Sequence, residues 1–580
     1  MEPEVKLEQP ESLDDVPLII GMAKQMKLDE LIEQYFPTHG SQNGLGNGKL
    51  ALGWLAFILS QSNHCKNAVR EWANNISSVL GALLQSQIRE VEFSDDRLAN
   101  LLDKLSDDIA WNAFEEGFSK SIIEIYDLPI ETVRVDGSAA CGYHEVTENG
   151  IMQFGHTKDY RPDLPQLKMM LATLDPGLPL AIDVVSGEQN DDILYTPLIR
   201  RVRPMINKTG VLFVGDCKMS SLAIRGGIEE KKDYYLSPLA LGTEKIRLYF
   251  QKLVDAIVDG TQEAVLIYKK IDINTPIKNK KTDAVTVEDN KMHYKLIGAG
   301  YEVEREQECG EEEKIKWNER IFVYRSIKFA ESEIAQLERT LKKAEAELLK
   351  LTPNPGKNSR QYYEEAKLNE SINKILKKYE MSDLFKVTYH TEAYKKLQRY
   401  VIKVERNEDE VNQKKNKCGW RPMVTNTSKE KLSFQAAIET YRAEWTLERC
   451  FRISKKSHLG ISPLYLRKDK RLKGITRLLS IGVRIITLLE YHICKNLKET
   501  EETILGLDVA HPNKAIKTPT AQSIFKKFCR EKIMLSRVIV NGKIYWGITQ
   551  MSETVRKVLI HLKIPLEVYE VAFYQNWSSL

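Results

Sequence analysis

Hydrophobic positions in the first part of the chain recur at helical spacing. Between residues 14 and 125, apolar side chains stand three and four positions apart, as at Leu28, Leu31 and Ile32, and they dominate residues 50–59. This spacing places apolar side chains on one face of a helix. The segment HGSQNGLGNG (39–48) interrupts the pattern with Gly and Asn, as a loop does. The pattern predicts an all-α domain over residues 1–127, of a size suited to DNA binding or dimerisation.

Strand-like runs replace the helical spacing after Thr132. Three of them, TVRVDGS (132–138), KMMLATLD (168–175) and LAIDVVSG (180–187), predict strands, and Pro176-Gly177 is a tight turn between the last two. A helix is expected over 191–206. The apolar run GVLFVGD (210–216) is typical of a strand buried on both faces. With a further helix and strand after it, this order predicts an α/β core over 128–240, a mixed sheet with flanking helices.

Residues 241–418 do not continue that alternation. Strand-like alternation is present in four stretches: 294–304, 316–326, 384–391 and 400–405. Two charged helical stretches, 328–351 and 358–379, lie between them, with a loosely heptad-like apolar seam that fits an antiparallel hairpin. A solvated amphipathic hairpin and a partner-binding hairpin fit this seam equally well. We interpret the block as a β-rich insertion with a helical hairpin.

The chain then returns to the core pattern. GWRPMVTNT (419–427) predicts a strand, the stretch YRAEWTLERCFRISKK (441–456) predicts a helix, and residues 478–489 predict a buried helix. These elements place the second part of the core at 419–495. The C-terminal region, 496–580, contains RVIVNGKIYWGI, a β-hairpin indicated by its Asn-Gly turn.

The helix expected at 441–456 carries two adjacent stripes. One sector of about 100° is largely apolar, as in a helix packed on a core, and holds Ala443, Leu447, Cys450, Phe451 and Ser454. Beside it stands a second stripe of residues: Tyr441, Glu444, Glu448, Arg452 and Lys455. From position 448 to 477 the chain has ten Lys or Arg and two acids. Glu448 therefore borders a buried face inside a basic field, which is typical of phosphate contacts.

Composition limits the class of protein more than it identifies a function. A hydrophobic fraction of 42% and a charged fraction of 29% are those of an ordinary folded domain, and the net charge is only +4. No apolar run reaches the roughly 18–20 residues of a membrane span. The acidic N-terminus lacks the pattern of a signal peptide. The eight cysteines include no CxxC pair, so we expect a reducing, cytoplasmic compartment and no zinc module.

Three acids are candidates for chemistry. Asp136 and Asp216 each follow a predicted strand, and on neighbouring strands their carboxylates would share one crevice, which Glu448 could complete from a helix. Hard carboxylate oxygens suit Mg²⁺ or Mn²⁺, and two such ions about 3.5–4 Å apart promote phosphoryl transfer. Simpler roles stay open: a turn residue for Asp136, a helix cap for Asp216, an ion pair between Glu448 and Arg452, and a solvated face for the basic run.

The order of these elements and motifs resembles the DDE transposases of prokaryotic insertion sequences. The similar branch has a long β-rich insertion before the catalytic Glu and a Tyr-Arg-Glu-Lys signature, Y-x2-R-x3-E-x6-K. Tyr441, Glu448 and Lys455 fall on that signature, whereas Glu444 stands at its Arg position. The surrounding stretches also match: VRVDGS, GHTKDYRPDLPQLKMML, GVLFVGD, ERCFRISK and PLYLRKDKRLKGI.

The resemblance implies a ribonuclease H-like core in which Asp136, Asp216 and Glu448 are catalytic and hold two Mg²⁺ or Mn²⁺ ions. It implies DNA contacts from five residues: Tyr441, Arg449, Arg452, Lys455 and Lys456. The expected partners are the inverted terminal repeats, target DNA and a second copy of the chain, in the cytoplasm and at the nucleoid. Two other functions stay open. One is an inactive or repurposed sequence-specific DNA-binding protein, in which Glu444 at the signature's Arg position would indicate lost catalysis. The other is a Mg²⁺-dependent nuclease without strand transfer.

Overall fold

The computed structural model describes residues 5–156, 161–175, 177–271, 293–310, 314–354, 356, 361–456, 459–461, 464, 466–508 and 510–570. The chain divides into two compact units. One combines Met1–Tyr234 with Arg442–Leu580, and the other is Tyr235–Tyr441.

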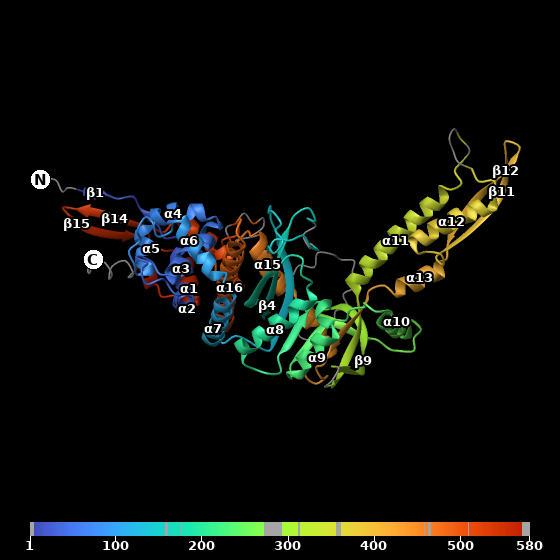
Figure 1. The fold of residues 1–580 in the computed structure, drawn as a ribbon, viewed down its shortest axis with the longest axis horizontal. Helices are drawn as coiled ribbons and strands as arrows, with labels where there is room; N and C mark the ends of the chain where they lie inside the picture. The colour runs from blue at the N-terminus through green and yellow to red at the C-terminus, as the bar shows by residue number, and fades with distance from the viewer. Residues whose placement is uncertain are drawn as a thin grey trace. The chain divides into compact units, whose positions relative to one another are not determined.

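The N-terminal segment of the first unit is helical, as its apolar spacing predicted. Its helices are α1 (Val16–Gln25), α2 (Leu28–Tyr35), α3 (Asn47–Gln61), α4 (Lys66–Asn75), α5 (Ser77–Leu84), α6 (Asp95–Leu105) and α7 (Asp108–Tyr126). Residues 50–59 of α3 are all buried, because that stretch is apolar on every side. Helices α1, α2, α4, α5 and α6 pack on α3, and α7 packs on α2 and α6 (Figure 1).

A mixed sheet follows in the same unit. Strands β3 (Thr132–Cys141), β4 (Gln166–Leu174) and β5 (Leu178–Ser186) form an antiparallel meander, and β6 (Leu212–Gly215) pairs with β3 in parallel. The resulting order is β5-β4-β3-β6. Phe213, Val214 and Gly215 of β6 are buried, which confirms the strand expected from the apolar run.

Helices cover both faces of this sheet. Lys168 of β4 binds Asp191, at the start of α8 (Asp192–Ile206). The next residue, Met169, lines a small cavity with Phe451 of α15 (Trp445–Lys456) and Val483 of α16 (Asp469–Glu499). Because successive strand residues point to opposite faces, α8 covers one face while α15 and α16 cover the other. The buried helix predicted at 478–489 is the middle of α16.

Both ends of the chain contribute to one small sheet of the first unit. β6 is followed by two helical elements, η1 (Cys217–Ser220) and α9 (Leu222–Glu230). After the long helix α16, the C-terminal elements are α17 (Ala521–Glu531), β14 (Met534–Val540), β15 (Lys543–Ile548), α18 (Glu553–His561) and α19 (Glu567–Glu570). β14 pairs with β15 and with two N-terminal strands, β1 (Val5–Leu7) and β2 (Glu11–Ser12) (Figure 1). The hairpin indicated by Asn541-Gly542 is confirmed.

The strands of the second unit pair antiparallel with one another. The strands run in the order β7 (Tyr234–Pro238), β13 (Trp420–Thr425), β10 (Ile315–Ser326), β9 (His293–Cys309) and β8 (Val265–Ile271), and α10 (Glu244–Val258) precedes β8. Tyr235 donates a hydrogen bond to buried Glu319 at 2.7 Å and accepts one from Trp317 at 2.9 Å. Arg305 donates to the other oxygen of Glu319 at 2.6 Å, so both oxygens of this fully buried carboxylate have a partner.

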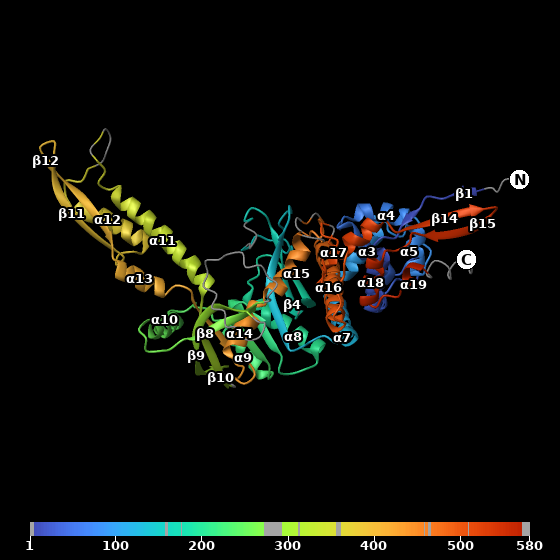
Figure 2. The same ribbon diagram turned by 180° about the vertical axis from the view of Figure 1, so that it is seen from behind.

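A helical hairpin and a two-stranded ribbon form the rest of the second unit. The elements are α11 (Ile327–Leu349), α12 (Glu365–Tyr379), β11 (Phe385–Tyr394), β12 (Leu397–Arg406) and α13 (Glu408–Asn416). Leu341, Leu348, Ile372 and Ile402 belong to their shared core. Figure 2 shows α12 lying along the ribbon. The helical hairpin is thus confirmed, but its second helix begins at Glu365, later than predicted. Residues 361–364 are not helical, and residues 358–360 lie outside the described residues.

The single helix predicted over 441–456 was wrong. The structure has two helices, α14 (Phe434–Arg442) and α15, with a turn at Ala443 and Glu444 between them. Both the amide and the hydroxyl of Thr446 donate to the Ala443 carbonyl, at 3.1 and 2.9 Å. The amide bond, from residue i+3 to residue i, takes the place of an α-helical bond to the Ala443 carbonyl. The threonine hydroxyl binds the same carbonyl, as threonine side chains often do near helix ends. Tyr441 and Glu444 therefore lie outside the helix that carries Glu448.

Candidate active site

Strand register brings Asp136 and Asp216 side by side. Val135 of β3 pairs in parallel with Gly215 of β6, and each acid is the next residue on its strand. β6 ends at Gly215, but β3 continues to Cys141, so the expectation that β3 ends at Asp136 was wrong. β3 runs on because its pairing with β4 extends to Cys141↔Gln166. The two acids lie at the carboxyl end of β6, where ligands of α/β sheets bind.

Two hydrogen bonds orient the carboxylate of Asp216. The Tyr195 hydroxyl of α8 donates to Oδ1 at 2.6 Å, and the Lys218 amide donates to the same oxygen at 2.9 Å. The second bond caps η1, so the helix-cap role considered for Asp216 is real. Among the described residues, nothing donates to Oδ2 of Asp216. One oxygen is therefore held by the protein and the other is available to a ligand.

The pKa of the Tyr195 hydroxyl depends on burial and on the charges of the two acids. Tyr195 is almost completely buried, and burial is the main cause that raises its pKa well above the ordinary value. The negative charges of Asp216 and Asp136 raise this pKa further. Tyr195 therefore stays protonated and donates its hydrogen at neutral pH. No sequence pattern predicts this role, because Tyr195 is simply a large residue on the buried face of a helix.

Asp136 faces the side of the sheet covered by α15. It is half-buried, and its Oδ1 accepts a hydrogen bond from the Gly137 amide at 2.7 Å. Asp136 on β3 pairs with Leu171 on β4. Leu171 lines the same small cavity as Phe451 and Ser454 of α15. Since paired residues point to the same face, Asp136 is oriented toward the face on which α15 packs.

Helix α15 is fixed by its apolar stripe and by two polar contacts. Leu447, Cys450 and Phe451 are buried, as the stripe predicted. Cys450 donates from Sγ to the Gly177 carbonyl at 2.8 Å, which ties α15 to the turn between β4 and β5. Arg449 forms an ion pair with Glu490 of α16. These contacts set the position of the whole helix, and with it that of Glu448.

Glu448 is exposed on α15, one turn before Arg452, which is also exposed. The simpler interpretation of an ion pair between them was wrong, since neither residue forms an ion pair within the described part of the chain. Among the residues that the structure describes, no group of three or more His, Cys, Asp or Glu lies close enough together to hold a metal ion. The structure therefore brings Asp136 and Asp216 together but does not bring Glu448 to them.

The two carboxylates fit a hard divalent cation. Mg²⁺ is usually held by one or two carboxylates together with waters and substrate phosphates, and does not need a complete protein cage. Asp136 and Asp216 form such a pair of carboxylates, and Oδ2 of Asp216 accepts no hydrogen bond from the described residues. Their hard oxygens suit Mg²⁺ or Mn²⁺ better than a soft metal.

The residues expected to contact DNA differ in their surroundings. Arg452 is exposed, Arg449 is engaged by Glu490, and Lys455 is only 8% exposed. The side chain of Lys456 lies outside the described part of the chain. Tyr441 belongs to the second unit. Among the described cations of α15, Arg452 is the exposed one.

A large cleft begins at the N-terminus of α15, and the sequence did not predict it. Its volume is about 1220 Å³, and its lining includes Trp445, Arg449, Tyr491, Lys495, Lys498 and Lys517. Trp445 is 60% exposed although it is a large aromatic residue. Glu448 lies between Trp445 and Arg449 in sequence, so the cleft starts next to a candidate catalytic residue.

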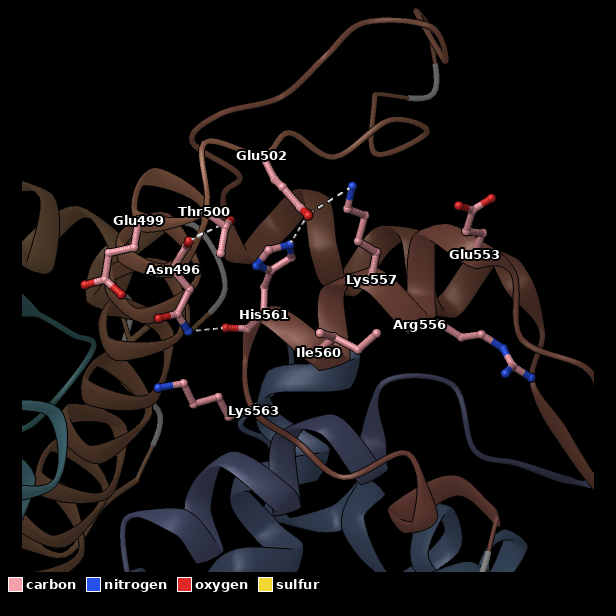
Figure 3. A pocket seen from close by; sticks show the side chains of 10 residues that line it. All are labelled: Asn496, Glu499, Thr500, Glu502, Glu553, Arg556, Lys557, Ile560, His561 and Lys563. Carbon is pink, nitrogen blue, oxygen red and sulfur yellow. Dashed lines mark hydrogen bonds and ion pairs between the residues drawn. The ribbon is translucent and has the colours of Figure 1, made fainter.

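A second cavity, of about 630 Å³, lies between α16 and α18. Figure 3 shows Glu502 between His561 and Lys557, with hydrogen bonds of 2.9 Å to His561 and an ion pair of 3.1 Å to Lys557. Asn496 donates to the carbonyl of His561. Glu502, His561 and Lys557 satisfy one another in this cavity.

Comparison with known proteins identifies the family. The family model described as "Transposase DDE domain" matches residues 143–481, which is more than half of the chain. The chain therefore belongs to the DDE transposase family and is an enzyme that acts on DNA. The match includes Asp216 and Glu448, and it begins seven residues after Asp136.

One solved structure found similar is titled "Cryo-EM structure of piggyBac transposase synaptic complex with hairpin DNA (SNHP)". The similarity covers 90% of this chain and 82% of that chain, with 7% identity and a TM-score of 0.37. A comparison with curated proteins finds no match. Within the described residues, none of the helices combines the length and the apolarity that a membrane crossing requires.

Proposed function

We propose that this transposase binds the inverted ends of its element, and cleaves and joins DNA strands by Mg²⁺-dependent phosphoryl transfer. The observation that carries the proposal is the pair of carboxylates at Asp136 and Asp216, on adjacent parallel strands of a chain that belongs to the DDE transposase family. DDE transposases generally use divalent metal ions. Asp136, Asp216 and Glu448 would be the ligands of two Mg²⁺ or Mn²⁺ ions.

The strand order supports a ribonuclease H-like core. An antiparallel meander of β3, β4 and β5, with β6 parallel to β3, is the arrangement expected for that fold, and Asp136 and Asp216 occupy its first and fourth strands. In this arrangement Glu448 is the acid supplied by a helix. Because Glu448 is exposed and not at the pair, DNA itself would complete the site by bringing phosphate oxygens between strand and helix.

Each group of the site has a distinct task in this proposal. A metal held by Asp136, Asp216 and Glu448 would supply activation of the attacking oxygen and stabilisation of the leaving oxygen. Tyr195 holds one oxygen of Asp216 and leaves the other available to a ligand. Arg452 would contact the DNA backbone, with Lys455, Lys456, Arg449 and Tyr441 as further candidates. The reaction needs two DNA ends, so we propose a homodimer in the DNA complex.

The cleft at α15 is a candidate path for part of the DNA next to Glu448, through its lysines and its two aromatic residues, Trp445 and Tyr491. Its lining also has four acids, which balance its four cations: Asp175, Glu490, Glu501 and Glu502. Lysines neutralise phosphates, and aromatic rings give bases a surface for stacking. Its volume, about 1220 Å³, is large enough for several nucleotide groups to enter.

One experiment tests the proposal. Purified protein is incubated with a plasmid that carries the element's ends, in Mg²⁺ or in EDTA, beside the Asp136→Asn variant. Cleavage that needs Mg²⁺, is lost in the variant and is followed by strand joining supports transposition. Cleavage without joining indicates a nuclease, and a mobility shift without cleavage indicates a DNA-binding protein in which Glu444 marks lost activity. Either of these two results overturns the proposal.

A further inference from the structure

Two hairpins of this chain have turns of the same backbone conformation but with different residues. In the first unit, Asn541 and Gly542 connect β14 to β15 with φ of +48° and +77°. In the second unit, Lys395 and Lys396 connect β11 to β12 with φ of +48° and +66°. Both loops have two residues, closed by the pairs Val540↔Lys543 and Tyr394↔Leu397. The comparison isolates the choice of residues at the turn.

A two-residue turn with positive φ at both positions favours Asn-Gly, because Gly has no Cβ and Asn tolerates the left-handed region. Lysine has no such advantage, and its Cβ is strained at positive φ. The β14–β15 turn has the favourable pair, whereas the β11–β12 turn has two lysines in its place. Strain of this kind points to a function at the tip that outweighs it.

The ribbon is braced below its tip. Val387, Tyr389, Tyr400 and Val404 pack on the core shared by α11 and α12. Arg406, at the end of β12, is paired with Glu338 at 3.0 Å and with Glu345 at 2.9 Å. The ribbon runs along α12, and its turn lies at the end away from α13 (Figures 1 and 2). A rigid base therefore presents the tip at low entropic cost.

The tip places two exposed lysines at successive positions. Neither Lys395 nor Lys396 forms an ion pair within the described residues, whereas Lys403 is paired with Glu405 at 2.5 Å. Lys386 of β11 is also exposed and has no ion pair among the described residues, so the tip differs in having two such lysines together at a turn. The ammonium of Lys395 lies 5.2 Å from the ring centre of Tyr394.

An apolar side chain accompanies the two charges. Leu397, which pairs with Tyr394 at the base of the turn, is 56% exposed. Two free cations above an aromatic and an aliphatic side chain suit a polyanion that also has apolar surface, as sugars and base edges of DNA do. A two-stranded ribbon has the width to enter the major groove of a duplex.

We propose that residues 394–397 form a DNA-contacting tip, in which Lys395 and Lys396 bind phosphates and Tyr394 and Leu397 lie against the sugar or groove edge. The inference rests on the proposed function only in taking DNA as the polyanion. It assigns a binding role to part of the insertion that is separate from the carboxylate site.

The natural test replaces the two lysines with the pair that the other hairpin uses, Lys395→Asn with Lys396→Gly. This double variant removes both charges and at the same time relieves the turn, so folding is not weakened. Binding is measured in EDTA by fluorescence anisotropy on a duplex with the element's end and on an unrelated duplex, over a series of salt concentrations. We expect weaker binding to both duplexes and a salt slope lower by about 2, since each phosphate contact contributes about 0.9.

Two controls make the result specific. Lys395→Arg with Lys396→Arg keeps the charges, so the salt slope should stay at the wild-type value. Lys245→Gln with Lys252→Gln removes two exposed lysines from α10 and should leave the slope unchanged. A wild-type slope in the Asn-Gly variant overturns the inference, as does an equal fall in the α10 variant. Binding without metal does not depend on cleavage, so a wild-type protein that binds but does not cut DNA contradicts the proposed chemistry alone.

Discussion

The two strand acids and the helix acid of the candidate site are held in different ways. Asp136 and Asp216 are adjacent because β3 and β6 pair in parallel, and Asp216 is further held by Tyr195 and the Lys218 amide. Glu448 is exposed on α15, whose position depends on packing and on its contacts with Gly177 and Glu490. Backbone pairing thus positions two of the three candidate acids, whereas the position of the third depends on how α15 packs.

This difference separates metal binding from catalysis. A preformed carboxylate pair should bind a divalent ion weakly in the free protein, because two ligands and water suffice for a hard cation. An acid carried by a helix should matter once DNA fills the space between strand and helix. The two regions can therefore be distinguished by measuring Mn²⁺ affinity without DNA and cleavage with it.

The largest effect is expected at the strand pair. Asp136→Asn or Asp216→Asn should lower the Mn²⁺ affinity of the free protein by more than about 100-fold. The expected loss exceeds the roughly 10–100-fold typical when a residue that only hydrogen-bonds to a metal ligand is replaced. Cleavage should fall to background. Isothermal titration with Mn²⁺ measures the affinity. Asp191→Asn is the matched control, since Asp191 is already paired with Lys168 at 2.7 Å, and an equal loss there would contradict the assignment.

Tyr195→Phe should have the next largest effect. The variant keeps the buried ring and removes the hydroxyl that donates to Asp216, so Mn²⁺ affinity should fall by about 10–100-fold. Cleavage should recover as the Mn²⁺ concentration is raised, which a loss of packing would not allow. If thermal unfolding and metal affinity both match the wild type, Tyr195 does not position the carboxylate.

Glu448→Gln should separate the two regions most clearly. Cleavage should be lost, yet the Mn²⁺ affinity of the free protein should change by less than about twofold, because the pair of strand carboxylates suffices for binding. Titration and plasmid cleavage are run on the same preparation. Glu444→Gln, on the turn before α15, serves as the control and should leave metal affinity unchanged. A loss of affinity in Glu448→Gln equal to that of the strand variants would erase the distinction.

The smallest effect on metal affinity is expected from Gly177→Ala, which tests how the helix is docked. Gly177 has φ of +97°, and a Cβ there would stand 2.8 Å from the Thr446 carbonyl of α15. The substitution should lower the free energy of unfolding by about 1–3 kcal/mol and reduce cleavage, with Mn²⁺ affinity unchanged. Denaturant unfolding measures the stability.

Gly542→Ala is the matched control for that substitution. Its φ is +77°, but a Cβ there would meet nothing within 4 Å. It therefore carries the backbone cost alone, and the difference between the two variants measures the clash with α15. Equal stability losses, with cleavage intact in both, would show that the turn does not position the helix.

Much of the local structure was predictable because each prediction depended on neighbours in sequence. Helical spacing identified residues 14–125 as helical, the run GVLFVGD identified β6, and Asn541-Gly542 identified its hairpin. Asp136 and Asp216 were candidates because each stands at or near the end of an apolar strand pattern. The stripe of Leu447, Cys450 and Phe451 was also correct, since burial of a helix face follows from its period.

The errors arose where a contact between distant residues decides the outcome. β3 extends past Asp136 because β4 offers it partners as far as Gln166. The helix at 441–456 divides because Thr446 binds the Ala443 carbonyl twice, although neither Pro nor Gly marks the break. Tyr195 was missed because its partner, Asp216, is 21 residues away in sequence.

By itself, the sequence determined the elements, their order, the family resemblance and the residue types that can do the chemistry. Periodicity and short motifs suffice for these, since they express the local geometry of helices, strands and turns. The tertiary structure alone decided which residues meet: the register that joins Asp136 to Asp216, the hydroxyl that holds Asp216, and the docking of α15. Such contacts depend on the packing of elements far apart in the chain, which no local pattern encodes.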